Sequence, residues 1–185
     1  MEPLLAYIAS GRPYLGICLG MQTLFAASEE NPGVKGLGLI PATIKRFTVD
    51  SQHGMAVPHM GWNGVNVRKA SPFLRPGTDE KFYFVHSFLA ESTPDMREWT
   101  LATTNYGIEY VSAVQKDNII ATQFHPEKSG ASGLALIRRF LEGTGDLPGE
   151  VVIDPPPTAL APRIIACLDV RANDAGDLVV TKGDQ

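Results

Sequence analysis

One segment, Tyr14-Leu15-Gly16-Ile17-Cys18-Leu19-Gly20, constrains the fold of this chain more than any other. It begins with a short apolar run, preceded by Pro13, that is consistent with a buried strand, and the stretch from Leu19 to Ala27 is expected to continue as a helix. Glycines two residues before and two residues after Cys18 allow a tight turn that a β-carbon would obstruct, as in a nucleophile elbow. A strand that enters a helix through such a turn is typical of an α/β fold.

The elbow would also give Cys18 the surroundings of an activated thiol. The turn lifts the side chain out of the sheet and places it at a helix N-terminus, where the helix dipole favours the thiolate and lowers the pKa of the thiol. The backbone N–H of Leu19 then lies where it can donate to a developing oxyanion. Short motifs recur by chance, so the pattern alone is also explained by a small buried cysteine in a tight turn.

A second segment, His125-Pro126-Glu127, supplies the groups that a thiol nucleophile requires, and it follows an apolar strand that ends at Phe124. Residues i and i+2 of an extended chain face the same way, and Pro126 biases His125 toward an extended conformation. The imidazole can then take the thiol proton and return it to a leaving amine, while the carboxylate fixes the tautomer of the ring. The alternative for this pair is a surface histidine beside a solvated glutamate; the elbow elsewhere in the chain favours a catalytic triad.

The remainder of the first 143 residues alternates short β-branched and aromatic runs with turn residues, which indicates strands joined by loops. The expected strands cover residues 37–40, 43–47, 65–67, 81–85 and 100–104, and a hairpin joins 111–114 to 119–124. Apolar residues at helical spacing predict an amphipathic helix over about 132–141, with Leu134, Ile137, Phe140 and Leu141 on its apolar side. Beyond Gly143 the chain is rich in glycine and proline, which predicts an extended linker.

Composition excludes several classes of function. The chain has 185 residues and a net charge of −4, with 44% hydrophobic and 19% charged residues, values that are ordinary for a protein with a buried core. It has no basic run for a nucleic acid and no apolar stretch near the ~20 residues that cross a bilayer. Its two cysteines, Cys18 and Cys167, do not form a disulfide framework, so a cytoplasmic, reducing location is expected. No metal or cofactor is predicted.

The two catalytic segments resemble those of a known family. Residues 13–22, Pro-Tyr-Leu-Gly-Ile-Cys-Leu-Gly-Met-Gln, are similar to the nucleophile segment of class I glutamine amidotransferases, and residues 123–127, Gln-Phe-His-Pro-Glu, to their second catalytic segment. The resemblance implies a flavodoxin-like α/β fold, in which a mixed sheet is flanked by helices. It also implies that Cys18 attacks the side-chain amide of glutamine to form a thioester, with His125 as base and Glu127 as its orienter. Ammonia leaves, and water releases glutamate.

The same resemblance assigns residues that contact the substrate and a partner. Leu19, Gln22 and Ser87 match glutamine-binding positions of the family. Pro58-His59-Met60-Gly61-Trp62-Asn63 resembles a segment particular to imidazole glycerol phosphate synthases, whose glutaminase supplies ammonia to a cyclase barrel in histidine biosynthesis. In that group Trp62 and Lys128 match residues at the interface with the barrel, which is present in cis or in trans. The alternatives are a partly buried loop aromatic for Trp62 and a solvated lysine for Lys128.

The C-terminal residues resemble the first strand of the (β/α)8 cyclase barrel of the same enzymes. Alternation along residues 161–170 places Arg163, Cys167 and Asp169 on one face of a strand. The resemblance implies that Arg163 is a gate residue, that Asp169 acts as an acid/base group in cyclisation, and that Lys182 contacts a phosphate-bearing substrate. For Cys167, ordinary interior packing is the preferred interpretation. The expected organisation is a glutamine amidotransferase domain over 1–143, a linker over 144–161 and the start of the barrel over 162–185.

Neither module is complete by comparison with the family. No Pro-Gly-Val-Gly-type segment, which supplies a second oxyanion donor, precedes Cys18, and the barrel portion is a single strand. We therefore expect a fragment truncated at both ends, with lowered turnover, since loss of one oxyanion donor typically costs about 10²–10³. Two alternatives to an active glutaminase stay open. One is an impaired fragment that only docks on a barrel, and the other is a glutamine amidotransferase of another pathway.

Overall fold

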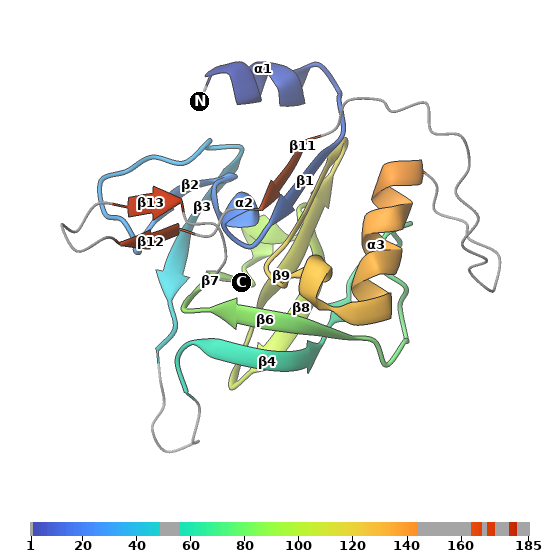
Figure 1. Ribbon diagram of the computed structural model, residues 1–185. Helices are drawn as coiled ribbons and strands as arrows, with labels where there is room; N and C mark the ends of the chain where they lie inside the picture. The colour runs from blue at the N-terminus through green and yellow to red at the C-terminus, as the bar shows by residue number, and fades with distance from the viewer. Residues whose placement is uncertain (1, 49–55, 144–163, 168–169, 173–177, 181–185) are drawn as a thin grey trace.

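The computed structural model describes residues 2–48 and 56–143, and the backbone of 164–167, 170–172 and 178–180 (Figure 1). Its centre is a nine-stranded mixed sheet with the order β11-β1-β10-β9-β7-β3-β2, in which β8 also pairs with β9, and β5 with β8. The bounds of these strands are β1 Tyr14–Ile17, β2 Phe25–Ser28, β3 Ile40–Arg46, β5 Asn66–Val67, β7 Phe88–Glu91, β8 Thr100–Tyr106, β9 Ile108–Lys116, β10 Ile119–Thr122 and β11 Ile164–Cys167. The mixed sheet predicted for residues 1–143 is confirmed.

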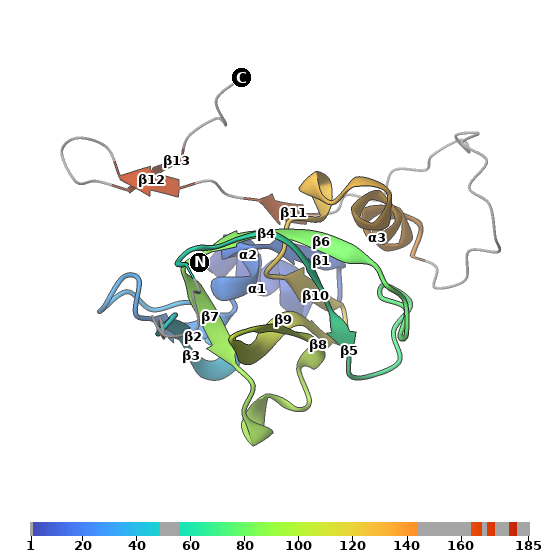
Figure 2. The same cartoon turned by 90° about the horizontal axis from the view of Figure 1, so that it is seen from below.

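Two antiparallel ribbons stand apart from the central sheet. One joins β4 (His59–Gly64) to β6 (Lys81–His86), and the other joins β12 (Val170–Ala172) to β13 (Leu178–Val180). Figure 2 shows the ribbon of β4 and β6 curving over one side of the molecule, across from β8 and β9. The helices are α1 (Glu2–Ala9), α2 (Leu19–Gln22) and α3 (Gly130–Glu142), with short 3-10 turns η2 (Pro94–Met96) and η3 (Pro126–Lys128). Among the described residues, no helix is long and apolar enough to cross a membrane.

The two central strands are buried along their whole length. All four residues of β1 and all four of β10 are buried, and the strands run parallel with Gly16 opposite Ala121 and Ile17 opposite Thr122. Alternation sends neighbouring side chains into two cores. Leu15 and Ile17 join the core that contains Leu136 and Phe140 of α3, whereas Tyr14 joins the core that contains Ile8 of α1. The sheet is therefore covered on both faces, as the α/β prediction requires.

The helix predicted from Leu19 to Ala27 is wrong beyond its first turn. The α2 helix ends at Gln22, and residues 25–28 form β2, which pairs in parallel with β3 so that Phe25 lies opposite Ile40. Leu24 and Phe25 are buried as expected, but the pairing with a strand distant in sequence satisfies their backbone and overrides local helical spacing. Of the strand predicted over residues 37–40, only Ile40 belongs to one.

The predicted hairpin and C-terminal helix are both present. Strands β9 and β10 pair antiparallel with Ile119 opposite Lys116, and α3 covers the range expected to be helical. The buried side of α3 is nevertheless centred on Leu136 and Phe140, while Leu134 and Leu141 are 62% and 46% exposed. The spacing of the apolar residues identified the helix but assigned two of its leucines to the wrong face.

The strand predicted as the start of a barrel joins the central sheet instead. Strand β11 pairs in parallel with β1, with Tyr14 opposite Ile164 and Ile17 opposite Cys167. An unpaired strand edge leaves backbone N–H and C=O groups without partners, and this pairing satisfies those of β1. The described residues of β11 thus extend the central sheet, and the described part of the chain forms no barrel around them. The linker at 144–161 and the residues Arg163, Asp169 and Lys182 lie outside the described part of the chain.

Candidate active site

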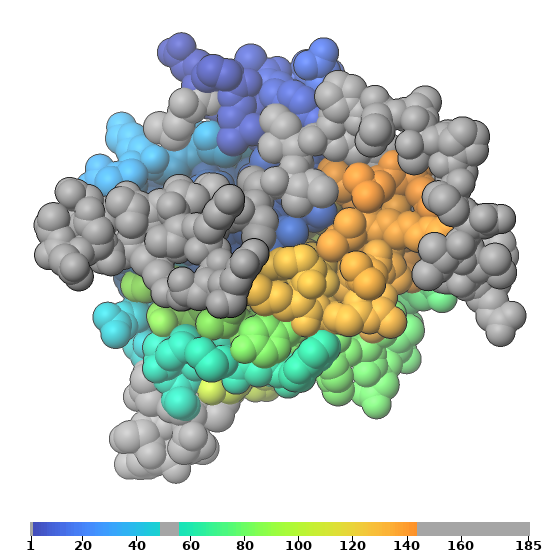
Figure 3. Space-filling model, viewed as in Figure 1, coloured from blue at the N-terminus to red at the C-terminus, as the bar shows by residue number. Residues whose placement is uncertain are grey.

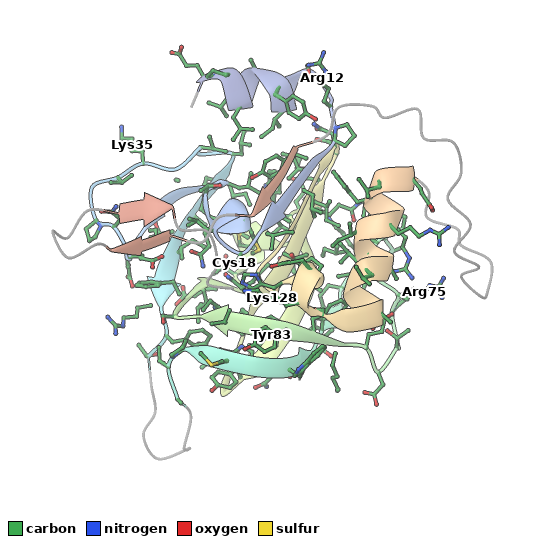
Figure 4. The ribbon with its side chains drawn as sticks, viewed as in Figure 1. Arg12, Cys18, Lys35, Arg75, Tyr83 and Lys128 are labelled. Atoms are coloured by element: carbon green, nitrogen blue, oxygen red, sulfur yellow. The ribbon has the colours of Figure 1, made fainter. Side chains whose placement is uncertain are left out.

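Cys18 occupies a strained turn between β1 and α2 (Figure 4). Its φ of 51° and ψ of −105° are unusual for a residue with a β-carbon, and such strain is often held at functional sites. The turn is tight enough that a β-carbon at Gly16 would lie 2.6 Å from the carbonyl oxygen of Gly20. The backbone N–H of Cys18 donates to the carbonyl of Thr122 at 2.7 Å, which anchors the turn to β10. The elbow predicted from the two glycines is confirmed in its geometry.

The helix that follows the elbow is a single turn, which changes one expectation. Because α2 spans only Leu19–Gln22, few peptide dipoles are aligned behind the sulfur of Cys18. The macrodipole of a longer helix was expected to stabilise the thiolate, and one turn supplies a smaller share of that field. Hydrogen-bond donors near the sulfur therefore contribute more to stabilising the thiolate than the sequence analysis expected.

His125 and Glu127 form a close pair at the end of β10. The Nδ1 atom of His125 lies 2.6 Å from Oε1 of Glu127, and the imidazole is buried. The backbone N–H of His125 donates to the carbonyl of Tyr83 at 2.9 Å, which ties the segment to β6. His125 has the predicted extended conformation, with φ −100° and ψ 94°. Glu127, however, lies in the 3-10 turn η3, so the turn and not an extended strand brings its carboxylate to the ring.

The charge of the Glu127 carboxylate is favoured by its surroundings. Burial raises its pKa, but the hydrogen bond from His125 and the charges of His125 and Lys128 outweigh burial and hold the pKa below its usual range. An ionised carboxylate on Nδ1 requires a proton on that nitrogen. The other ring nitrogen, Nε2, is then the one that can accept a proton from a thiol and donate it to a leaving group.

The parallel register of β1 and β10 brings the two segments to the same edge of the sheet. The last residues of the two strands, Ile17 of β1 and Thr122 of β10, lie opposite each other. Cys18 directly follows the first of them, and Gln123 directly follows the second. Carboxyl ends of neighbouring parallel strands share one edge, where α/β proteins place their ligands. A contact of 3.5 Å from Nε2 of Gln123 to Sγ of Cys18 joins the two segments directly.

A cavity of about 480 Å³ opens beside the sulfur of Cys18. The three residues predicted to contact glutamine, Leu19, Gln22 and Ser87, all line it. It also contains two charged residues that sequence reasoning missed, Glu30 and Lys35. A free amino acid carries one charge of each sign, to which such a pair is complementary. The acidic and basic residues within 29–35, a short distance after the elbow, are the sequence feature that could have indicated these two residues.

The two predicted interface residues lie near each other at the surface. Trp62 lies on β4, is 58% exposed and packs edge-on against Tyr83 with ring centroids 6.0 Å apart. It is therefore a strand residue with an exposed ring, not a partly buried loop aromatic. Met60, which shares its strand and its face, is 60% exposed. Lys128 lies in η3, which contacts β6. Figure 3 shows the ribbon of β4 and β6 at the surface next to α3.

Among the described residues, no group of three or more His, Cys, Asp or Glu side chains could hold a metal ion. The remaining site predictions, Arg163, Asp169 and Lys182, fall outside those residues.

An elbow cysteine at the same sheet edge as a buried imidazole and its carboxylate partner is the arrangement that the sequence resemblance predicted for the triad-type amidotransferases. The family model for glutamine amidotransferase class-I matches residues 1–143, and the chain belongs to this family. A solved glutamine amidotransferase aligns with a TM-score of 0.53 and 18% identity, covering 76% of this chain and 66% of that one, which supports the fold.

Within this family the chain belongs with the imidazole glycerol phosphate synthases. The imidazole glycerol phosphate synthase subunit HisH of Methanothermobacter thermautotrophicus is 50% identical over 141 residues, which cover 76% of this chain and 68% of that protein. Imidazole glycerol phosphate synthase hisHF, chloroplastic, of Arabidopsis thaliana is 50% identical over 185 residues, which cover all of this chain and 31% of the relative. The chain thus spans about a third of the length of the hisHF relatives that it matches.

Proposed function

We propose that this chain carries the glutaminase portion of an imidazole glycerol phosphate synthase and hydrolyses glutamine to glutamate and ammonia. The observation that carries the proposal is that an elbow thiol and an imidazole–carboxylate pair follow the carboxyl ends of two neighbouring parallel strands, and that the thiol lines a cavity of about 480 Å³. Neither a buried structural cysteine nor a solvated His–Glu pair requires this arrangement.

In the proposed reaction, His125 Nε2 takes the proton of Cys18, and the thiolate attacks the carboxamide carbon of glutamine. The carbonyl oxygen becomes an oxyanion, to which the backbone N–H of Leu19 donates. The C–N bond breaks as the imidazolium returns the proton to nitrogen, so that ammonia leaves and a glutamyl thioester remains. Water, deprotonated by His125, then attacks the thioester and releases glutamate and the thiol. Glu127 stabilises the imidazolium through Nδ1 in both halves.

The cavity suits an amino-acid substrate. Gln22 and Ser87 line the cavity together with Cys18 and offer polar groups, and Glu30 and Lys35 offer a negative and a positive charge. These charges are complementary to the ammonium and carboxylate groups of free glutamine. A neutral amide substrate without these groups would leave both charges unmatched, which favours a free amino acid over an internal peptide amide.

The partner proposed for this site is a cyclase barrel that consumes the ammonia. The names of the relatives support it, because one is a HisH subunit and others are hisHF chains. We assign Met60, Trp62 and Lys128 to the surface that meets the barrel, since Met60 and Trp62 are exposed apolar residues on one strand. The segment 144–161 is proposed as the linker. Residues 162–185 are proposed as the start of the barrel in a longer fused chain, whereas in this chain β11 pairs with β1.

The C-terminal residues keep the roles that the resemblance implies. Arg163 is proposed as a gate residue, Asp169 as an acid/base group in cyclisation, and Lys182 as a contact to the phosphate-bearing substrate. The cytoplasmic location also stays a prediction, and the Arabidopsis thaliana relative is named chloroplastic.

The test is glutamate release from glutamine by the full chain, with and without a separately produced cyclase barrel. We expect release that is abolished in Cys18→Ala and unchanged in Cys167→Ser. Binding of the barrel without glutamate release above the Cys18→Ala background would overturn the proposal in favour of a docking module alone. Ammonia release that no cyclase barrel stimulates or consumes would favour an amidotransferase of another pathway.

A further inference from the structure

Gln123 is a buried amide that touches the nucleophile. Its residue is 0% exposed, and it directly follows β10. Its Nε2 atom lies 3.5 Å from Sγ of Cys18, and its Oε1 atom accepts from Nε2 of Gln22 at 2.9 Å. A buried amide with both ends engaged has a fixed position, because rotating it would break two contacts at once.

The orientation of the Gln123 amide follows from the partners along this chain of contacts. Nε2 of Gln22 lies 3.3 Å from the backbone carbonyl of Phe88, and a carbonyl can only accept a hydrogen bond. Gln22 must therefore present its NH₂ group on this side, and the same group donates to Gln123. Gln123 consequently offers oxygen to Gln22 and its own NH₂ group to Cys18. Flipping either amide would set two acceptors or two donors against each other.

The carbonyl that sets this polarity is itself held in place. Nδ1 of His86 lies 2.7 Å from the same Phe88 carbonyl, so the oxygen receives a second hydrogen bond. Phe88 begins β7, which pairs with β3 and β9 in the central sheet. The fold therefore fixes, through one backbone oxygen, which end of the Gln123 amide faces the sulfur.

We propose that Gln123 stabilises the Cys18 thiolate by donating an Nε2–H hydrogen bond to Sγ, in an orientation imposed by Gln22 and the Phe88 carbonyl. A donor to the charged form of an acid favours that form. The single turn of α2 aligns few dipoles behind the sulfur, so this hydrogen bond carries a correspondingly larger share of the stabilisation. The inference rests on the proposed function, because it adds a thiol-contacting residue to the same site.

The experiment compares Gln123→Met and Gln123→Glu with the unsubstituted chain, all in a Cys167→Ser background so that Cys18 is the single thiol. The rate of Cys18 alkylation by iodoacetamide is followed by mass from pH 5 to 10. Methionine fills a similar volume without a donor, so the rate at pH 7 should fall about fivefold while the high-pH plateau is unchanged. The glutamate of Gln123→Glu places a negative charge beside the sulfur, so the pH midpoint of the alkylation rate should lie higher than in Gln123→Met. Gln115→Met, the same change on β9, should leave the profile unchanged.

Unchanged midpoints in both Gln123 variants would overturn the inference. A second measurement, NMR of the chain with Gln123 unsubstituted, does not depend on whether the Gln123 variants fold. The side-chain amide resonances of Gln123 should shift with the midpoint at which Cys18 titrates, and this shift should vanish in Cys18→Ala. Resonances that do not respond to the thiol would overturn the inference by themselves. The alkylation profile measures how readily the Cys18 thiol ionises and does not depend on hydrolysis of glutamine. Unchanged midpoints would therefore reject the role of Gln123 without rejecting the proposed glutaminase. Absence of glutamate release would reject the glutaminase while the alkylation profile could still be measured.

Discussion

Nδ1 of His125 lies 2.6 Å from Oε1 of Glu127 even though the backbone enters a 3-10 turn between the two residues. The proline between them both extends His125 and begins the turn that returns the carboxylate to the ring. The contact fixes the tautomer in which Nε2 is available for the thiol proton. The role that we propose for the carboxylate is orientation of a buried base, so removing its charge should affect turnover more than folding.

The first prediction concerns that carboxylate. Glu127→Gln keeps the volume but offers an amide that can present either an acceptor or a donor to Nδ1, so the tautomer is no longer fixed. We expect kcat for glutamine hydrolysis to fall by about 10²–10⁴, as when the corresponding acid of a triad is neutralised. Glu142→Gln is the matched control, because Glu142 pairs with Arg138 at the surface end of α3. Turnover within twofold of the unsubstituted chain in Glu127→Gln would contradict the assigned role.

Substitution by alanine should destabilise the chain strongly at Gly16 in the elbow and only slightly at Gly64 on β4. A β-carbon at Gly16 would lie 2.6 Å from the Gly20 carbonyl oxygen, whereas at Gly64 the nearest atom is the flexible end of Lys81 at 3.3 Å. Gly16→Ala should lower the free energy of unfolding by about 2 kcal/mol or more, since the backbone must move. Gly64→Ala should change it by less than about 1 kcal/mol. Urea denaturation of both variants measures the difference, and equal effects would mean that the turn is less tight than described.

A buried hydroxyl joins two imidazoles in the core near the cavity. The Tyr110 hydroxyl lies 2.9 Å from Nδ1 of His59 and 3.2 Å from Nε2 of His86. Because His86 donates through Nδ1 to the Phe88 carbonyl, its neutral ring accepts at Nε2, so Tyr110 donates to His86 and accepts from His59.

Tyr110→Phe would leave an imidazole donor and an imidazole acceptor unpaired. We expect a loss of about 2 kcal/mol in the free energy of unfolding, measured in urea. Tyr83→Phe is the control, since Tyr83 is only partly buried. A Tyr110→Phe chain as stable as the control would show that the hydroxyl contributes nothing net.

The same two imidazoles predict a stability that depends on pH. Burial lowers the pKa of His59 to about 4 and the pKa of His86 to about 3. As pH falls below ~6.5, the unfolded chain binds protons on these rings and the folded chain does not, so the free energy of unfolding decreases. The slope is at most about 1.4 kcal/mol per pH unit for each ring. Stability is fully present above pH ~6.5 and is lost progressively toward pH 4.

Urea unfolding at pH 7, 6 and 5 measures this slope. His59→Gln removes one of the two buried rings and should make the slope shallower, whatever the variant does to stability at pH 7. A stability that is flat between pH 7 and 5, or a slope that His59→Gln does not reduce, would contradict the neutral state of the pair.

The exposed ring on β4 leads to a prediction about the partner. Trp62→Ala should change the free energy of unfolding by less than about 0.5 kcal/mol, because the side chain is 58% exposed. Its affinity for a cyclase barrel should fall by about tenfold or more, since large aromatic residues dominate interfaces. Ile108→Ala, at an apolar residue 41% exposed on β9, is the control and should bind as the unsubstituted chain does. Equal affinities for the barrel would exclude β4 from the docking surface.

Much of the site could be predicted from sequence because its determinants are local. The glycines around Cys18 and the proline after His125 restrict or release the backbone at their own positions. The elbow at Cys18 and the extended conformation of His125 are therefore found at the positions that these residues predict. The hairpin of β9 and β10 was equally accessible from alternation and turn residues.

The features that sequence analysis missed depend on contacts between distant segments. Phe25 is a strand residue because β3 pairs with it, although its own neighbours favour a helix. The contact of Gln22 with Gln123 joins residues 101 positions apart, and no pattern within either segment indicates it. The place of β11 beside β1 likewise follows from an available strand edge, not from the spacing of its own side chains.

Covalent labelling tests most directly whether Cys18 is an activated nucleophile in a glutamine site. The full chain is incubated with a diazo-ketone analogue of glutamine, and its intact mass and peptides are measured. We predict a single adduct on the Cys18 peptide that glutamine prevents and that is absent in Cys18→Ala. No adduct under these conditions, or an adduct that persists in Cys18→Ala, would contradict it.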